Sequence, residues 1–350
     1  MIPYQNERGA SFRGRDALPR LSVRLHGLAP KSCVSLACTA EAHGYASVWF
    51  AENPSDRGLL PAASACAAAT SRIRIGIGIV NPYTRHPTLI AMEFGALDEL
   101  AEGRALLGIG SGIGAQIERL GYRYRPLAAM QDAIRIVRAL LAGDTVRYSG
   151  EVFSADNIAL KFRPPRPDTP LYMAAMGDRS LALCGRIADG LIVSNMCPPA
   201  YTQHAAGIAV AAAERAGRPR PEIVQYVPCV VRPDRATARD AAKAAIATML
   251  TTFWPVGDDW PPLRETIVRH SGIAKPEVID ALGRLRRGES AACVLDDRYI
   301  DAFAIAGTAE DCLTAAARYR RAGVDELALT FAGGQPAIDM ACLGSALGNA

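Results

Sequence analysis

Residues 71–112, SRIRIGIGIVNPYTRHPTLIAMEFGALDELAEGRALLGIGSG, carry the pattern that decides the fold. A short β-branched run at 73–79 is followed by helical periodicity at 87–101 and by a second apolar run at 105–109. Pro87 suits the first turn of the intervening helix. Two apolar strands joined by a helix are typical of a parallel βαβ unit, whose strands are buried on both faces.

The same alternation continues in both directions along the chain. We expect eight strands that close into a (β/α)8 barrel of the α/β class, with a doubly wound open sheet as the alternative. Residues 152–166 are predicted to form a linker, because Pro164, Pro165 and Pro167 follow one another closely at its end. The predicted strands cover residues 21–25, 47–51, 73–79, 105–109, 171–175, 191–194, 223–231 and 326–331. The predicted helices cover residues 31–43, 60–69, 87–101, 130–141, 180–187, 201–216 and 237–252, and Thr308 is expected to cap a last one.

Two segments depart from this rhythm. Residues 1–20 are polar and are expected to form a flexible tail, which leaves 21–350 as a single domain. Residues 252–306 are expected to form an insertion of small helices before the last βα unit. Its tryptophans, Trp254 and Trp260, either cover the substrate or pack on the barrel, and we favour packing.

Composition excludes several classes of protein. The chain has 350 residues and a formal net charge of +4, and no lysine or arginine stripe indicates nucleic-acid binding. Nine cysteines include no CxxC pair and no zinc spacing, so we expect reduced thiols, no metal site and a cytoplasmic location. No apolar run is long enough to span a membrane, and the N-terminus does not resemble a secretory signal.

In a (β/α)8 barrel the active site lies at the carboxyl ends of the strands. This rule selects polar and glycine-rich segments that directly follow predicted strands. The candidates are His26, Gly27 and Pro30 after the first strand, Glu52 and Asn53 after the second, residues 80–86 after the third, 110–114 after the fourth, 176–178 after the fifth, and Asn195 and Met196 after the sixth.

Three of these segments have competing interpretations. Residues 110–114, GSGIG, match a dinucleotide fingerprint only weakly and are better suited to a flat ring packed on the backbone. Asp178 lies just before the helix predicted at 180–187, where it serves either as an N-terminal cap or beside a bound phosphate. Arg85 and His86 lie near the barrel mouth, in a loop whose prolines already explain a turn. Serine-triad, zinc and P-loop signatures are absent.

Four segments together resemble the luciferase-like flavin oxidoreductase superfamily. They are SRIRIGIGIVNPYTRHPTLIA (71–91), LDELAEGRALLGIGSG (97–112), LYMAAMGDRSLALCGRIADGLIVS (171–194) and DAFAIAGTAEDCLTAAARYRRAGVDELAL (301–329). Within that superfamily the chain resembles methylenetetrahydromethanopterin reductase and related enzymes of the deazaflavin coenzyme F420. The resemblance covers residues from about 21 to 332 and implies a homodimer acting on a small molecule.

The resemblance also implies residue roles. Gly78-Ile79 matches the position of a non-proline cis peptide whose bulge backs the central ring of the coenzyme. The glycines at 110 and 112 would contact the ring, and the residues from 175 to 177 would hold the phosphate through backbone N–H groups. The implied cofactor-binding residues are Gly78, Ile79, Val80, Asn81, Gly110, Ser111, Gly112, Ala175, Met176 and Gly177.

Glu52 and His26 are the predicted catalytic residues, because either could supply or remove a proton beside the ring. The methanopterin reductases carry a glutamate after strand one and an aspartate after the strand-four glycines. Here His26 and Ile113 stand in those places, so the resemblance extends to the cofactor more than to the pterin substrate. The alternatives are an FMN-dependent monooxygenase and a barrel that binds a flavin or pterin without catalysis.

Overall fold

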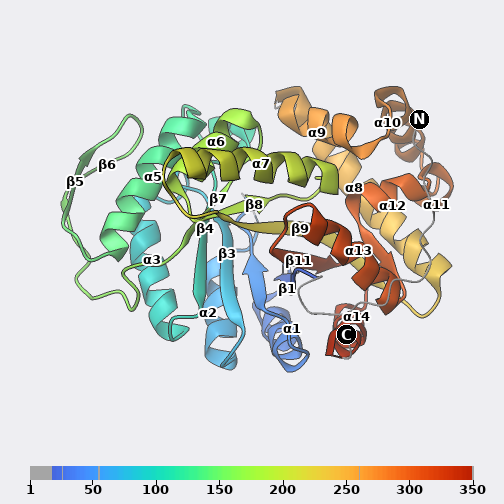
Figure 1. The fold of residues 1–350 in the computed structure, drawn as a ribbon, viewed down its shortest axis with the longest axis horizontal. Helices are drawn as coiled ribbons and strands as arrows, with labels where there is room; N and C mark the ends of the chain where they lie inside the picture. Colours follow the sequence, from blue (N-terminus) through green and yellow to red (C-terminus); the bar gives the residue numbers. More distant parts are fainter. Residues whose placement is uncertain (1–17, 26, 54–55, 260, 349–350) are drawn as a thin grey trace.

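Eight parallel strands close into a barrel in the computed structural model (Figure 1). The structure describes residues 18–25, 27–53, 56–259 and 261–348. The predicted (β/α)8 barrel is confirmed, because β8 pairs with β9 and β11 pairs with both β9 and β1, which leaves no open edge. The barrel strands are β1 (Arg20–Leu25), β2 (Ser47–Phe50), β3 (Arg74–Val80), β4 (Ala105–Ile109), β7 (Leu171–Ala174), β8 (Gly190–Val193), β9 (Glu222–Val231) and β11 (Glu326–Phe331).

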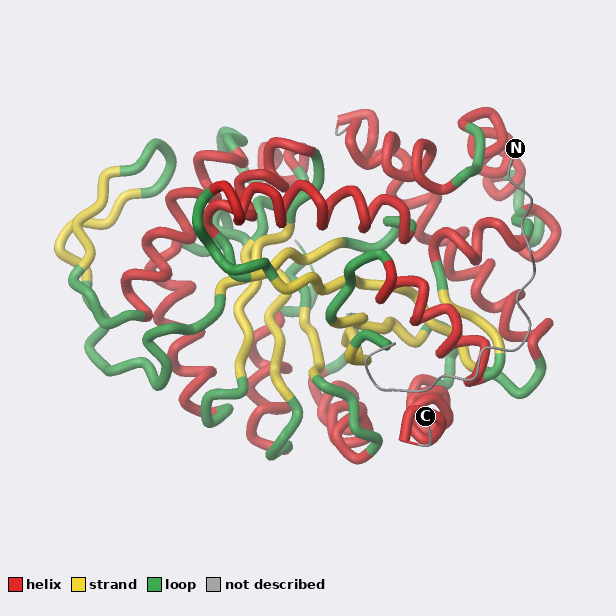
Figure 2. Tube along the Cα trace, in the orientation of Figure 1, coloured by secondary structure: helices red, strands yellow, loops and turns green. Residues whose placement is uncertain are grey.

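Helices surround the strands on the outside of the barrel (Figure 2). Pro87 occupies the first turn of α3 as predicted, and Thr308 caps α13 by accepting a hydrogen bond from the Asp311 backbone N–H. Across the described part of the chain, no helix has the length and apolar character needed to cross a membrane. The helices between barrel strands include α1 (Pro30–Ala42), α2 (Leu59–Ala69), α3 (Pro87–Leu100), α5 (Pro126–Leu141), α6 (Asp178–Ile187), α7 (Pro199–Arg215) and α13 (Ala309–Arg321), and α14 (Pro336–Gly348) follows β11.

Two elements differ from the prediction. The expected linker at 152–166 contains β6 (Ser154–Ile158), which pairs antiparallel with β5 (Val146–Ser149) in a hairpin at one end of the molecule's long axis (Figure 1). A short helix, α4 (Gly114–Arg119), follows the strand-four glycines, where only a loop is predicted. Both elements are mostly polar or short, so neither carries a strong apolar period.

The helical insertion before the last unit is present and begins inside a longer helix than predicted. Helix α8 (Arg235–Asp259) extends past residue 252 and leads into the insertion. The chain then returns to the barrel through a short strand that pairs with β9. The remaining elements of the insertion are α9 (Pro261–Ser271), α10 (Lys275–Arg286), α11 (Ala291–Val294), α12 (Asp297–Phe303) and β10 (Ile305–Gly307).

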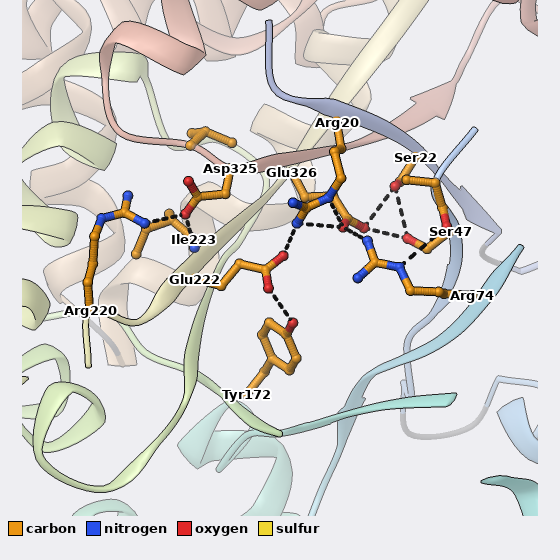
Figure 3. Close-up of polar contacts among 12 residues, drawn as sticks. Arg20, Ser22, Ser47, Arg74, Tyr172, Arg220, Glu222, Ile223, Asp325 and Glu326 are labelled. Carbon is orange, nitrogen blue, oxygen red and sulfur yellow. Dashed lines mark hydrogen bonds and ion pairs between the residues drawn. The ribbon is translucent and has the colours of Figure 1, made fainter. Parts of the chain in front are cut away.

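A buried carboxylate connects several strands inside the barrel, near the ends at which the strands begin (Figure 3). Glu326 of β11 is fully buried and accepts hydrogen bonds from Ser22 Oγ at 2.8 Å and Trp49 Nε1 at 2.7 Å. Ser47 Oγ also donates to it, and Arg74 forms an ion pair with it at 2.5 Å. Burial acts to raise the pKa of the Glu326 carboxyl, but Arg74 and the three donors hold it below its ordinary value. This network joins β1, β2, β3 and β11 at the end of the barrel opposite the site.

Candidate active site at the barrel mouth

A cavity of about 610 Å³ opens where the carboxyl ends of the strands meet. Its position follows the rule for (β/α)8 barrels that was used to select candidates. Glu52, Gly78, Ile79, Asn81 and Gly112, all predicted site residues, line this one cavity. His26 lies outside the described residues.

The bulge predicted at Gly78-Ile79 is present. The Gly78-Ile79 peptide is cis, and the pairing of β3 with β4 shifts register between Gly78 and Val80. Two groups hold the bulge from either side: the Glu52 backbone N–H donates to the Ile79 carbonyl at 3.0 Å, and the Tyr226 hydroxyl donates to the Gly78 carbonyl at 2.8 Å. The half-buried Ile79 side chain therefore projects from a fixed ridge into the mouth.

Gly78 has a packing role in addition to its place in the cavity wall. A Cβ added there would lie 2.0 Å from Tyr226 Oη and 2.7 Å from Trp49 Cε3. Trp49 and Tyr226 belong to the apolar cluster that fills the barrel interior. The glycine lets these two aromatic residues support the backbone directly beneath the ridge.

The Glu52 carboxylate connects the cavity to the loop after β3. Its Oε2 accepts a hydrogen bond from the Asn81 backbone N–H at 3.0 Å, and its Oε1 lies 3.6 Å from Arg85 Nη2. About 19% of its side chain is exposed, so it reaches the cavity while keeping both partners. Glu52 therefore lines the cavity and also anchors the loop that follows the ridge.

Arg85 and His86 have structural partners. Arg85 also forms an ion pair with Glu93 of α3. The Nδ1 atom of His86 accepts a hydrogen bond from the Thr88 backbone N–H and so caps α3. A role in the loop and helix therefore explains both residues, and neither lines the cavity at the mouth.

A second cavity, of about 530 Å³, shares the Ile79 ridge with the first. Gly110, Ser111 and Gly112 line it, and Tyr124 holds their loop in place. The Tyr124 hydroxyl contacts Ser111 Oγ and donates to the Gly112 carbonyl, both at 3.0 Å. Gly112 has a φ of +71°, and a Cβ there would lie 2.3 Å from the Asn81 side-chain nitrogen. The conformation of this loop therefore requires glycine at position 112.

The far end of the second cavity is formed by the start of α6. Ala175, Met176 and Gly177, the predicted phosphate-binding residues, line this cavity. Gly177, with a φ of +86°, is the N-cap residue of this helix, and Asp178 is the first helical residue. Of the two interpretations of Asp178, the structure therefore does not support the N-terminal cap. The Asp178 carboxylate instead lies 3.1 Å from His204 Nε2. Arg179, which is exposed and lines the same cavity, was not predicted.

Helix α8 covers the mouth between the two cavities. Phe253 lines both of them, and Met249 and Thr252 line the first. Trp254 is 7% exposed and packs in the core with Arg264 stacked 4.8 Å above its ring. The start of the insertion therefore covers the site, whereas Trp254 packs as favoured from the sequence. Trp260 lies outside the described residues.

Arg24 and Tyr226 are among the residues of the first cavity that sequence reasoning missed. Both lie within strands that were predicted as buried apolar runs, and both point into the barrel. Asn195, which was predicted, lines the cavity with a buried Oδ1 that has no hydrogen-bond partner among the described residues. The signal for Arg24 was a charged residue at an inward position of a strand that is otherwise apolar.

Comparison with known proteins places this geometry in a family. The model of the luciferase-like monooxygenase family matches residues 16–326. The 5,10-methylenetetrahydromethanopterin reductase of Methanolobus tindarius is 30% identical over 279 residues, covering 78% of this chain and 82% of that protein. An F420-dependent glucose-6-phosphate dehydrogenase of Beutenbergia cavernae is 31% identical over 249 residues, covering 67% and 74%.

A solved structure agrees with the fold. The coenzyme F420-dependent tetrahydromethanopterin reductase of Methanopyrus kandleri superposes with a TM-score of 0.82 at 23% identity, covering 93% of this chain and 97% of that chain. The chain belongs to the luciferase-like monooxygenase family.

Proposed function

We propose that the chain is an F420-dependent oxidoreductase that transfers a hydride between the deazaflavin and a small organic substrate. The observation that carries the proposal is the Ile79 ridge, which stands between two connected cavities. A relative that aligns with two thirds of this chain is an F420-dependent dehydrogenase. When bound, the deazaflavin supplies a ring carbon that gives or accepts the hydride.

The residues present fit such a cofactor. Glycine at positions 110 and 112 lets the loop backbone pack directly beside the ridge, because a Cβ at either position would lie within 3.0 Å of the Ile79 or Asn81 side chain. The buried Oδ1 of Asn195 lacks a partner among the described residues and could accept a hydrogen bond from a ring N–H. At the other end, Arg179 and the N-terminus of α6 suit an anionic tail group.

We assign proton handling to Glu52, together with His26. Glu52 lines the substrate side of the ridge, and a carboxylate positioned there can hold a proton for an alcohol or carbonyl oxygen. The Phe253 side chain of helix α8 lines both cavities, and we expect it to limit the access of water to them. We do not extend the proposal to a pterin substrate, because Ile113 lines the cavity at the position where the resemblance to the reductases implies an aspartate.

The direct test is a titration of the purified protein with F420 and, separately, with FMN, followed by ligand fluorescence. Tight binding of F420 alone, with turnover of carbonyls, imines or alcohols, is the expected result. Preference for FMN with oxygen consumption would favour a monooxygenase instead, since a deazaflavin lacks the N5 atom that supports the oxygen adduct. Binding without turnover of any donor would indicate a non-catalytic barrel, and binding of neither would refute the assignment.

We further propose a homodimer in the cytoplasm. Leu89, Met92 and Leu100 of α3 are 36%, 46% and 46% exposed, which is unusual for large apolar side chains on one helix face. All nine cysteines are unpaired thiols, as expected of a reducing compartment.

A further inference from the structure

Arg24 is a cation in the first cavity with no ion-pair partner among the described residues. It points inward from β1 next to Trp49 of β2, and its guanidinium lies 5.1 Å from the centre of the Tyr226 ring. Its Nε atom is buried and makes no hydrogen bond among the described residues. Burial lowers the pKa of Arg24, with only the Tyr226 hydroxyl acting against it, yet a guanidinium stays charged at neutral pH.

Among the residues that the structure describes, the other charged side chains that line this cavity already have partners. Glu52 pairs with Arg85 and the Asn81 backbone N–H. Asp56 has a partner of its own, and the exposed Arg57 donates to the Gly27 carbonyl at 3.0 Å. A desolvated cation without a counter-ion is costly unless a ligand supplies one. Arg24 thus stands as the uncompensated charge of the cavity wall.

A hydroxyl lies on the neighbouring strand at the same level. Val23 pairs with Leu329, so the next residues along the two strands, Arg24 and Thr330, are neighbours. Thr330 follows the alternation of Glu326 and Ala328, both of which face the barrel interior. Its Oγ1 is buried and has no hydrogen-bond partner among the described residues. A guanidinium fork and a hydroxyl are the donors that an oxyanion requires.

The position of Arg24 separates its ligand from the cofactor tail. Arg24 lines only the first cavity, whereas Arg179 and the α6 N-terminus line only the second. Tyr226 connects the Arg24 guanidinium to the ridge, because its ring stacks under Arg24 and its hydroxyl holds the Gly78 carbonyl. An anion bound by Arg24 would therefore be separated from the Gly78-Ile79 ridge by little more than the Tyr226 ring, and it would lie in the first cavity, which we assign to the substrate.

We infer that the substrate carries an oxyanion group, a carboxylate or a phosphate, which Arg24 binds with help from Thr330. This inference rests on the proposed function, since it assigns the first cavity to the substrate. The class is a small carbonyl compound or alcohol bearing that anionic group. A cavity of about 610 Å³ accommodates such a molecule beside a flat ring.

The test measures binding of benzoate, phenyl phosphate and neutral benzamide by calorimetry to protein loaded with F420. We expect at least one anion to bind tenfold or more tightly than benzamide, and the stronger anion identifies carboxylate or phosphate as the preferred group. Arg24→Met should abolish the difference, and Arg24→Lys should retain part of it. Arg57→Met removes an exposed charge at the same rim and should leave it unchanged.

Equal binding of benzoate, phenyl phosphate and benzamide to the wild type, or an anion preference that survives in Arg24→Met, would overturn the inference. Melting temperature and F420 affinity of each variant show that the fold and the cofactor site are intact. If Arg24→Met fails to fold, Arg24→Lys with weakened anion binding at unchanged F420 affinity supports the inference. The F420 titration reports the proposed function separately. Arg24-dependent anion binding by a protein that does not bind F420 would refute the proposed function and support the anion site.

Discussion

Glu52 combines two roles that a single substitution can separate. Gln at position 52 keeps an oxygen for the Asn81 N–H and so preserves the ridge, but it cannot carry a proton. We expect Glu52→Gln to bind F420 normally and to lose about 10²–10⁴-fold in kcat, the usual contribution of a general acid or base. Turnover across pH, followed by deazaflavin absorbance with a substrate from the carbonyl and alcohol screen, measures this loss.

The matched control for Glu52 is Glu93. It also pairs with Arg85 but does not line the cavity. Glu93→Gln should therefore keep kcat within a few-fold of the wild type. Full turnover by Glu52→Gln would remove that residue from the chemistry and leave it only an anchoring role.

Glu326 predicts how the protein responds to acid. Its carboxyl has a lowered pKa in the folded protein, so its stabilising contribution is present above the ordinary glutamate pKa of about 4.3 and is lost as pH falls through the folded value. We expect Glu326→Gln to lower the free energy of unfolding at pH 7 by about 3–5 kcal/mol, because Arg74 loses a buried partner. The gap between wild type and variant should narrow below pH 4.

Urea unfolding at pH 7 and pH 3.5 measures this difference. Glu222→Gln provides the comparison, since Glu222 forms an ion pair with Arg20, which also lies 3.4 Å from Glu326, but the Glu222 side chain is 29% exposed. Its effect should not exceed about 1 kcal/mol. An equal loss of unfolding free energy in the two variants would show that the buried Glu326 network contributes no more to stability than an exposed ion pair.

Among the elements, the loop between β4 and α4 gives the sharpest test of the cofactor platform. Gly112 and Gly121 have φ values of +71° and +87°, so alanine at either is strained to a similar degree. Only at Gly112 would the new Cβ meet a neighbour, the Asn81 side chain at 2.3 Å, whereas at Gly121 nothing lies within 4 Å. Gly112→Ala should therefore weaken F420 binding at least tenfold while Gly121→Ala leaves it nearly unchanged.

Fluorescence titration with F420 compares the two glycine variants, and their melting temperatures show whether the strain is matched. Comparable losses of F420 affinity would mean that backbone strain alone, and not the space above Gly112, accounts for the effect. Unchanged affinity in both variants would remove this loop from the cofactor site.

Sequence reasoning identified the elements that show a regular pattern of apolar residues within a short stretch of chain. Strands buried on both faces must be apolar throughout, so runs such as 73–79 and 105–109 were visible without a structure. The β5–β6 hairpin was missed because the strand SADNI is almost entirely exposed. Helix α4 was missed because it has six residues and no side-chain cap.

The architecture of the whole molecule explains why only part of the candidate site was predictable. The barrel brings every strand end to one mouth, so glycines and carboxylates after strands could be selected by position alone. Arg24 and Tyr226 were missed because their role depends on which face of a strand points inward and on what the other strands place opposite. The anchoring of Glu52 to the ridge likewise depends on contacts between strands that no local pattern contains.

The oligomeric state is a property of the whole molecule that one helix can test. Leu89, Met92 and Leu100 form a stripe along α3, since residues three or eleven apart lie on nearly the same face. We expect the wild type to have twice the 37.2 kDa mass of one chain in light scattering, and Met92→Glu to shift it towards the monomer by placing a charge in that stripe. Ile338→Glu on α14, where the isoleucine is 63% exposed, should leave the mass unchanged. A monomeric wild type would refute the dimer, and a dimer that tolerates Met92→Glu but not Ile338→Glu would place its interface on α14 and exclude α3.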